Sequence, residues 1–259
     1  MTKSKNTKNL LPVTVAAVIL AVLTACFAVY RSVIGPHLAR TRILSHKYEV
    51  YGGMKDEFKE SGLFKDMQSG KSFFFLGDSI TAGTVTEGLP WYNPLTPHIK
   101  GSISNLSSPG WTVNDLLYNQ DKIRSADIYV IAIGVNDALK IGNYSKTSDE
   151  YINGCRKLSD IIKKINPDAV IYFIAPWNYV NLDNELMQRG NELRKALSEW
   201  CSKTGYRFID PVPVIAETFA KEGSARFMYN EFHPNAPEGI ELFSYAVLKS
   251  ACGQTADVP

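Results

Sequence analysis

The first strong pattern along the chain is an uninterrupted apolar run near its beginning. Residues 10–30 contain no charged side chain, and Lys3, Lys5 and Lys8 precede them. A run of this length can cross a bilayer as an α-helix, whereas a cleaved signal peptide normally has a shorter apolar core and a small-residue cleavage site. The pattern therefore predicts a short basic N-terminus at residues 1–9 and a transmembrane anchor at residues 10–30.

The same run contains a motif that bacterial lipoproteins show before their lipid-modified cysteine, Leu23-Thr24-Ala25-Cys26. After Cys26, however, residues 27–30 stay apolar, where a lipoprotein usually turns polar. We therefore expect an uncleaved anchor, with a lipoprotein attached at Cys26 as the alternative. Basic residues on both sides of the run leave its orientation open. A short N-terminus before a long C-terminal part favours a single-pass protein of the cell membrane, with its main domain outside the cytoplasm.

Residues 31–70 are expected to be a connector with one short amphipathic helix at Lys55–Met67. From Lys71 onward, short apolar runs typical of buried strands alternate with helical patterns, which indicates a parallel sheet with helices on both faces. The expected strands are Phe73–Leu76, Ser102–Leu106, Ile128–Ile133, Val170–Ala175 and Arg207–Ile209. The expected helices are Val113–Gln120, Ser148–Ile165, Asn184–Lys203, Pro213–Lys221 and Pro237–Ser250. One α/β domain is therefore predicted for residues 71–252, followed by a C-terminal tail at residues 253–259.

Composition excludes several classes of function. The hydrophobic content of 45% and the charged content of 21% are values of a globular protein. The net charge is only +2, and no basic stripe is interleaved with aromatics, so nucleic acid is not an expected partner. The four cysteines make no disulfide scaffold, and none has metal-ligand spacing. Cys155 shares helical spacing with apolar neighbours, so we expect it in the core.

Candidate chemistry lies in four loops that follow predicted strands or lie near the C-terminus. Gly77-Asp78-Ser79 interrupts the apolar run Phe73–Leu76, and a hydroxyl at the carboxyl end of a buried strand is where open α/β sheets place reactive groups. Gly110 follows the second strand, Asn136 follows the third, and His233 lies late in the chain. Each signal alone is weak, because a turn, a helix cap or a surface histidine would explain it. Their order and placement predict one pocket at the carboxyl edge of the sheet.

With these residues in place, the chain resembles the SGNH hydrolases, also called the GDSL family, over roughly residues 71–250. Gly77-Asp78-Ser79-Ile80 matches the first block, Gly110 the second, Gly134-Val135-Asn136-Asp137 the third, and His233-Pro234 the last. The resemblance implies a three-layer α/β/α sandwich with a flavodoxin-like parallel sheet, here preceded by the transmembrane helix. It also implies a serine esterase that needs no cofactor and no metal.

The resemblance assigns a role to each of the four residues. Ser79 is the expected nucleophile, and His233 takes its proton and returns it to the leaving alcohol. The expected oxyanion hole consists of the backbone N–H groups of Ser79 and Gly110 and the side-chain amide of Asn136. The family usually has aspartate three residues before the histidine, whereas this chain has Asn230.

Asn230 leaves the third member of the catalytic site open. An asparagine supplies no negative charge, so Glu231, Asp210 or a backbone carbonyl is a candidate to orient the imidazole of His233. We expect Asn230 to hold the loop, and Glu231 or a carbonyl to accept the Nδ1 proton.

The substrate is the least determined part of the prediction. Trp91 and Tyr92 lie near the nucleophile, Trp111 follows Gly110, and Asp78 precedes Ser79. These four are candidate substrate contacts, although the aromatics would serve equally well as core residues. We expect an O-acetylesterase acting on an acylated envelope or capsular glycan. A glycan O-acetyltransferase with the same Ser–His site and a non-catalytic glycan-binding module are the alternatives.

Overall fold

The computed structural model describes residues 10–35, 37–38, 41, 56–139, 146–177 and 184–252. The expected N-terminus at 1–9, the tail at 253–259 and much of the expected connector lie outside these residues. The chain divides into two units, Met1–His46 and Lys47–Pro259.

The first unit contains the predicted apolar helix. α1 (Leu10–Val29) continues into a π-helical turn, η1 (Tyr30–Ile34). The segment Val15–Ile34 is long and apolar enough to cross a membrane, with a mean hydropathy of 2.1 and none of its residues buried. This finding is compatible with membrane anchoring, and a signal sequence would meet the same test.

The second unit is built on a sheet of five parallel strands in the order β2-β1-β3-β4-β5. The strands are β1 (Phe73–Gly77), β2 (Ile103–Ser107), β3 (Ile128–Ala132), β4 (Val170–Ile174) and β5 (Arg207–Ile209). All five expected strands are therefore confirmed to within one residue at each end. β1 and β3 are completely buried, because helices cover both of their faces, and this is why their sequences are unbroken apolar runs.

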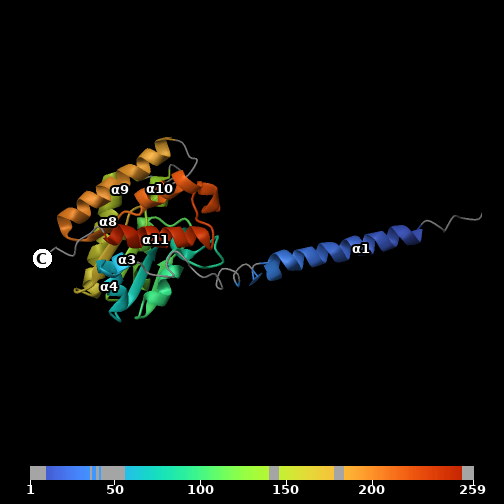
Figure 1. The fold of residues 1–259 in the computed structure, drawn as a ribbon, viewed down its shortest axis with the longest axis horizontal. Helices are drawn as coiled ribbons and strands as arrows, with labels where there is room; N and C mark the ends of the chain where they lie inside the picture. The colour runs from blue at the N-terminus through green and yellow to red at the C-terminus, as the bar shows by residue number, and fades with distance from the viewer. Residues whose placement is uncertain are drawn as a thin grey trace, which may run out of the picture. The chain divides into compact units, whose positions relative to one another are not determined.

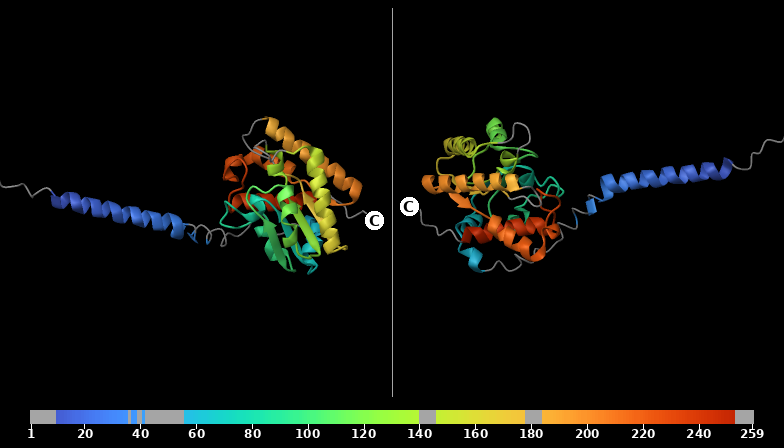
Figure 2. Two further views of the ribbon diagram at one scale, coloured as in Figure 1. Left: turned by 180° about the vertical axis from the view of Figure 1, so that it is seen from behind. Right: turned by 90° about the horizontal axis from the view of Figure 1, so that it is seen from above.

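Side chains of successive strand residues point to opposite faces and form two cores. Phe73 and Phe75 belong to one core, together with apolar side chains of α4 and α11. Phe74 and Leu76 belong to the other core, which is closed by α6, α8 and α9. Figures 1 and 2 show helices on both sides of the sheet. The expected three-layer α/β/α sandwich is thereby confirmed, and each buried Phe or Leu side chain contributes about 1.5–3 kcal/mol to its stability.

The longer helices match the expected ones, and the shorter ones show two differences. The helices of the second unit are α3 (Asp56–Lys59), α4 (Gly62–Gln68), α5 (Ser79–Ala82), α6 (Val113–Tyr118), α7 (Val135–Ala138), α8 (Ser148–Ile165), α9 (Asn184–Thr204), α10 (Val212–Glu222) and α11 (Glu238–Cys252), with short 3-10 turns at η2 (Asn93–His98), η3 (Gln120–Lys122) and η5 (Ser224–Arg226). The single helix expected at Lys55–Met67 is two helices, because the Ser61 side chain accepts a hydrogen bond from Phe64 N and starts a new helix. The helix expected at Val113–Gln120 ends at Tyr118, and η3 follows it.

Two further expectations concern packing. Leu63, Phe64 and Met67 are buried in the first core, so part of the stretch expected to be a connector contributes to the globular unit. Cys155 is completely buried on α8, which confirms it as a core residue.

Candidate active site

Ser79 lies at a tight junction between β1 and α5. Asp78 precedes it in an extended conformation and caps α5, because its Oδ1 accepts a hydrogen bond from Ile80 N at 3.0 Å. Gly77 is required by close packing, since a Cβ at this position would lie 2.2 Å from the Thr81 hydroxyl and 2.6 Å from the Ala132 carbonyl. Ser79 is therefore the first residue of a helix at the carboxyl end of a central strand, as expected for a reactive hydroxyl.

His233 reaches Ser79 from the loop between η5 and α11. Its Nε2 lies 2.8 Å from Ser79 Oγ. The loop is closed on itself by an antiparallel bridge between Met228 and Pro234, and Tyr229 N donates to the His233 carbonyl at 2.9 Å. The structure therefore brings together the two residues expected to act as nucleophile and base.

The Nδ1 atom of His233 faces Asn230. Asn230 Oδ1 lies 3.0 Å from this nitrogen and also accepts hydrogen bonds from the backbone N–H groups of Phe232, at 3.0 Å, and His233, at 2.8 Å. The expectation that Glu231 or a backbone carbonyl faces Nδ1 is therefore wrong. The turn places Asn230, three positions before the histidine, next to Nδ1. It leaves Glu231, two positions before the histidine, exposed.

Asp210, the third candidate partner of His233, is engaged elsewhere. Its Oδ1 accepts a hydrogen bond from Val212 N at 3.1 Å, and its Oδ2 lies 3.5 Å from Arg194 Nε. These contacts hold the end of β5 to α10 and α9, so Asp210 has a structural role.

The expected oxyanion-hole residues line the same pocket as the Ser–His pair. The pocket has a volume of about 270 Å³. Its walls are Ser79, Ile80, Thr84, Pro109, Gly110, Val135, Asn136, Leu139, Phe232 and His233. Gly110 has a φ of +76°, a left-handed conformation that favours glycine. The residues from four separate loops thus meet at one edge of the sheet.

Asn136 and its neighbour Asp137 fix the loop that carries Gly110. Asn136 Nδ2 donates to the Trp111 carbonyl at 2.9 Å, which leaves the second amide hydrogen for another acceptor. The Asp137 carboxylate accepts from Val113 N, with both oxygens at 3.2 Å. No separate role for Asp137 was predicted from the sequence. Its position directly after Asn136 was the available signal, but its contact with Val113 depends on the tertiary fold.

The acids around the site are buried, and this changes their protonation. Burial raises the pKa of Asp78 to about 7. Burial, together with the nearby charge of Asp78, raises the pKa of Asp137 to about 7. Asp78 Oδ2 has no hydrogen-bond partner within the described part of the chain. Burial also lowers the pKa of His233, which favours the neutral imidazole that a general base needs.

Three of the four expected substrate contacts are wrong, because their side chains are buried. Asp78 is 0% exposed, Trp91 1% and Tyr92 4%. Tyr92 stacks on Phe75 with ring centroids 3.6 Å apart, so these aromatics belong to the core beneath the site. Trp111 is half-buried, and its contact with a substrate stays a prediction.

Comparison with known proteins adds a family and a set of similar folds. The model of the GDSL-like lipase/acylhydrolase family matches residues 75–237. A comparison with curated proteins gave no match. Among solved structures, Axe2, an acetylxylan esterase from Geobacillus stearothermophilus, is 20% identical with a TM-score of 0.62, over 72% of this chain and 96% of that one.

Two other solved structures are similar to the same extent. A member of the lipolytic protein G-D-S-L family from Veillonella parvula is 19% identical with a TM-score of 0.59, over 69% of this chain and 96% of that one. LAE5, an alpha/beta hydrolase enzyme from the metagenome of Lake Arreo, is 18% identical with a TM-score of 0.59, over 74% and 98%. At these sequence identities, the comparison shows that the folds are similar and does not by itself show a shared activity.

Proposed function

Because the chain belongs to the GDSL-like lipase/acylhydrolase family, we propose that its globular unit is a serine esterase that forms an acyl-enzyme on Ser79. The observation that carries this proposal is the 2.8 Å contact between Ser79 Oγ and His233 Nε2 in a pocket shared with Gly110 and Asn136. A serine hydroxyl becomes a useful nucleophile only when a base takes its proton, and this contact supplies the base.

The first half of the reaction is acylation. Ser79 Oγ attacks the ester carbonyl carbon while its proton moves to His233 Nε2. Negative charge then develops on the former carbonyl oxygen. The N–H of Ser79 at the start of α5, the N–H of Gly110 and the second amide hydrogen of Asn136 are the donors proposed to bind it. When the tetrahedral intermediate collapses, His233 returns the proton to the leaving alcohol and the acyl group stays on Ser79.

The second half returns the enzyme to its resting state. Water attacks the acyl carbon, His233 Nε2 accepts a proton from this water, and the same donors bind the second oxyanion. Collapse of this intermediate releases the acid and restores the Ser79 hydroxyl. Both halves of the proposed reaction use the same groups: the Ser79 hydroxyl, the His233 imidazole and the three proposed oxyanion donors.

We propose an O-acetylated carbohydrate as the substrate. The pocket of about 270 Å³ has apolar walls at Ile80, Val135 and Leu139, which suits a short acyl group beside the nucleophile. A similar fold in an acetylxylan esterase supports the same substrate class. The apolar helix Val15–Ile34 supports a membrane anchor, and we propose that the domain lies outside the cytoplasm and acts on an envelope or capsular glycan.

The proposal is tested with the purified full-length chain in detergent. It is given an acetylated glycan or an aryl acetate, with and without a sugar acceptor, and Ser79→Ala serves as the control. Release of acetate that is lost in the control supports the esterase. Acetylation of the acceptor in place of acetate release would identify an acetyltransferase. Binding of the glycan with neither product would contradict catalysis and favour a binding module.

A further inference from the structure

We infer that Asn230 is a positioning residue that fulfils the role of the usual aspartate without a charge, because its amide can present only its oxygen to His233. This inference rests on the proposed esterase function, and it explains how the site works with the residue that departs from the family pattern. It also predicts a pH dependence that distinguishes this chain from one with aspartate at position 230.

An asparagine at this place is normally harmful. When the triad aspartate of a serine protease is changed to asparagine, kcat falls about 10⁴-fold because the histidine adopts the wrong tautomer. The cause is the amide N–H, which donates to Nδ1 of the ring. The ring proton then lies on Nε2, and Nε2 can no longer accept the proton of the serine.

The loop around Asn230 prevents this orientation. Asn230 Oδ1 lies within hydrogen-bond distance of Phe232 N, His233 N and His233 Nδ1, at 3.0, 2.8 and 3.0 Å. Two of these three nitrogens are backbone N–H groups, which can only donate. A rotated amide would point its own N–H₂ at two donors and would lose two hydrogen bonds, each worth about 0.5–1.5 kcal/mol.

The tautomer of His233 follows from this geometry. With the Asn230 oxygen fixed against the ring, Nδ1 must carry the proton in order to donate to it. Nε2 is then unprotonated in the neutral ring and accepts the hydrogen bond from Ser79 Oγ at 2.8 Å. Asn230 thus performs two functions, since it holds the loop and selects the tautomer that a general base requires.

The charge of His233 follows from its surroundings. None of the described residues that line the pocket is Asp, Glu, Lys or Arg. Asp78 on the α5 side binds Ile80 N, Asp137 on α7 binds Val113 N, and Glu231 in the loop itself is exposed. Burial lowers the pKa of His233, and within the described part of the chain no neighbouring carboxylate opposes it. The imidazolium formed during catalysis is therefore not stabilised by an adjacent charge, so it is a stronger acid toward the leaving alcohol.

The direct test is a titration of the full-length chain with ¹⁵N-labelled histidine, in detergent, followed by NMR. The signal of His233 is identified by its loss in His233→Gln. We expect the neutral ring to carry its proton on Nδ1. Asn230→Asp keeps the shape of the side chain and adds a charge, and we expect it to raise the pKa of His233 by about 1–3. A neutral ring protonated on Nε2, or an unchanged pKa in Asn230→Asp, would overturn the inference.

Kinetics supply the second readout. The acid limb of kcat/KM should move to higher pH in Asn230→Asp by the same amount as the pKa, since it reports the ionisation of His233 in the free enzyme. Asn230→Ala removes the side-chain acceptor at Nδ1, and we expect kcat to fall about 10²–10⁴-fold. Glu231→Gln removes a charge one residue away, and a loss of kcat as large as that of Asn230→Ala would assign the role to Glu231 and contradict the inference.

The two proposals can fail separately. A wild-type chain that hydrolyses esters but holds the proton on Nε2 would refute the role of Asn230 and leave the esterase standing. A chain with the expected tautomer and titration but no action on any ester would refute the esterase and support the geometric role of Asn230.

Discussion

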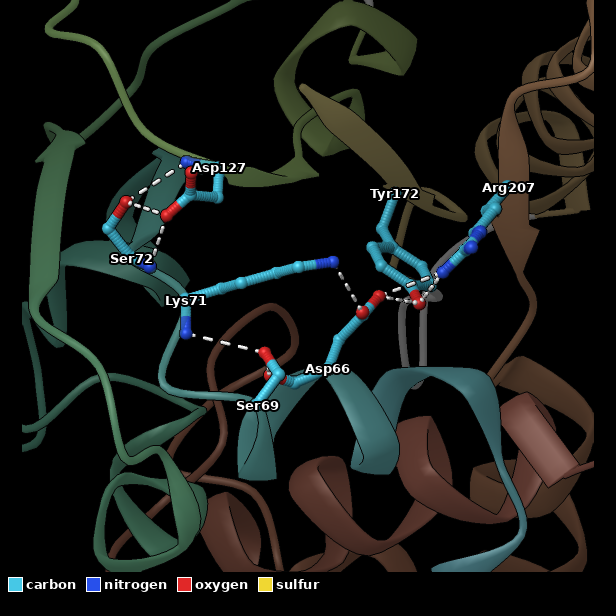
Figure 3. Close-up of polar contacts among 7 residues, drawn as sticks. All are labelled: Asp66, Ser69, Lys71, Ser72, Asp127, Tyr172 and Arg207. Carbon is cyan, nitrogen blue, oxygen red and sulfur yellow. Dashed lines mark hydrogen bonds and ion pairs between the residues drawn. The ribbon is translucent and has the colours of Figure 1, made fainter. Parts of the chain in front are cut away.

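The two edges of the central sheet differ in the surroundings of their acidic side chains. At the edge where the strands begin, acidic side chains are paired with cations or hydroxyl groups near solvent (Figure 3). At the edge where the strands end, the two acids next to the pocket, Asp78 and Asp137, are buried, and the residues proposed for catalysis are uncharged. The difference indicates that this fold places its compensated charges away from the pocket.

The amino edge is organised around Asp66 on α4. Its Oδ2 accepts hydrogen bonds from Tyr172 OH and Arg207 Nη1, each at 2.8 Å, and its Oδ1 lies 3.5 Å from Lys71 Nζ. These contacts join α4 to the strands β4 and β5, as Figure 3 shows. The carboxylate therefore stabilises the attachment of a helix to the sheet.

A second polar pair at the same edge joins the starts of β1 and β3. Asp127 Oδ2 accepts from Ser72 N at 2.8 Å and from Ser72 Oγ at 2.7 Å, and Ser72 Oγ accepts from Asp127 N at 3.0 Å. The hydrogen bonds from Ser72 hold the pKa of Asp127 below its usual value. This acid remains ionised through the neutral range.

Next to the pocket, the two acids of the carboxyl edge lack such compensation. Within the described residues, neither Asp78 nor Asp137 forms an ion pair, and burial raises the pKa of each to about 7. Asp78 and Asp137 instead bind backbone N–H groups that shape the loops of Ser79 and Gly110.

The largest predicted effect contrasts one serine from each edge. Ser79→Ala removes the proposed nucleophile, and we expect it to lower esterase kcat by about 10⁴-fold or more with an unchanged Tm. Ser72→Ala removes a hydroxyl from the opposite edge and should lower Tm while leaving kcat near its wild-type value. Ester hydrolysis and thermal unfolding of both variants check the pair. Equal losses of kcat would show that the edges are not separated in function.

The second prediction concerns the pH dependence of stability at the carboxyl edge. Asp78 has a pKa of about 7 in the folded chain and 3.8 as its ordinary value, so the folded state binds the proton more tightly. Its contribution is therefore most favourable below about pH 4 and is lost as pH rises through about 7. The pKa differs by about 3 between the two states. Because one pKa unit corresponds to about 1.36 kcal/mol, the contribution of Asp78 to the free energy of unfolding is at most about 4 kcal/mol.

Asp78→Asn isolates this contribution, since asparagine caps a helix as well as aspartate does. We expect the wild-type free energy of unfolding to fall relative to that of Asp78→Asn between about pH 4 and pH 8. Denaturant unfolding of both chains across this range is the measurement. A constant difference between the two curves would mean that Asp78 has no raised pKa.

The smallest predicted effect is at the amino edge. Asp66→Asn removes the charge that Arg207 and Lys71 share, and Arg207 is partly exposed. Surface ion pairs contribute about 0.2–1 kcal/mol, so the loss of stability should be of that order and should shrink at high salt. Unfolding at low and high salt checks this, with kcat as the control. A fall in kcat would contradict the separation of the two edges.

Much of this arrangement was predictable from the sequence, because it depends on local patterns. Buried strands such as Phe73–Gly77 and Ile128–Ala132 are continuous apolar runs between polar turns, and α8 has a regular helical period. The order of Ser79, Gly110, Asn136 and His233 predicted the pocket, because parallel strands end at a common edge.

The parts that escaped prediction depend on tertiary contacts. Trp91 and Tyr92 lie close to Ser79 in sequence, yet both belong to the core. Tyr92 stacks on Phe75, and Trp91 packs edge-on against Trp177. An aromatic sequence near a site does not say whether its rings face the substrate or the sheet. The contact of Asn230 with His233 was not predicted for a similar reason. The Asn230 oxygen is held by two backbone N–H groups, and these point at the same oxygen only in the folded loop.

The most direct test of the account is covalent labelling of the full-length chain with a serine-reactive phosphonate ester, followed by peptide mass spectrometry. Ser79 is the proposed nucleophile, and its reactivity depends on His233 at 2.8 Å. We predict a single label on Ser79 in the wild-type chain, and labelling at least about 100-fold slower in His233→Ala, because general base catalysis is worth about 10²–10⁴-fold. A label on a different residue, or equal labelling rates in the two chains, would contradict the proposed active site.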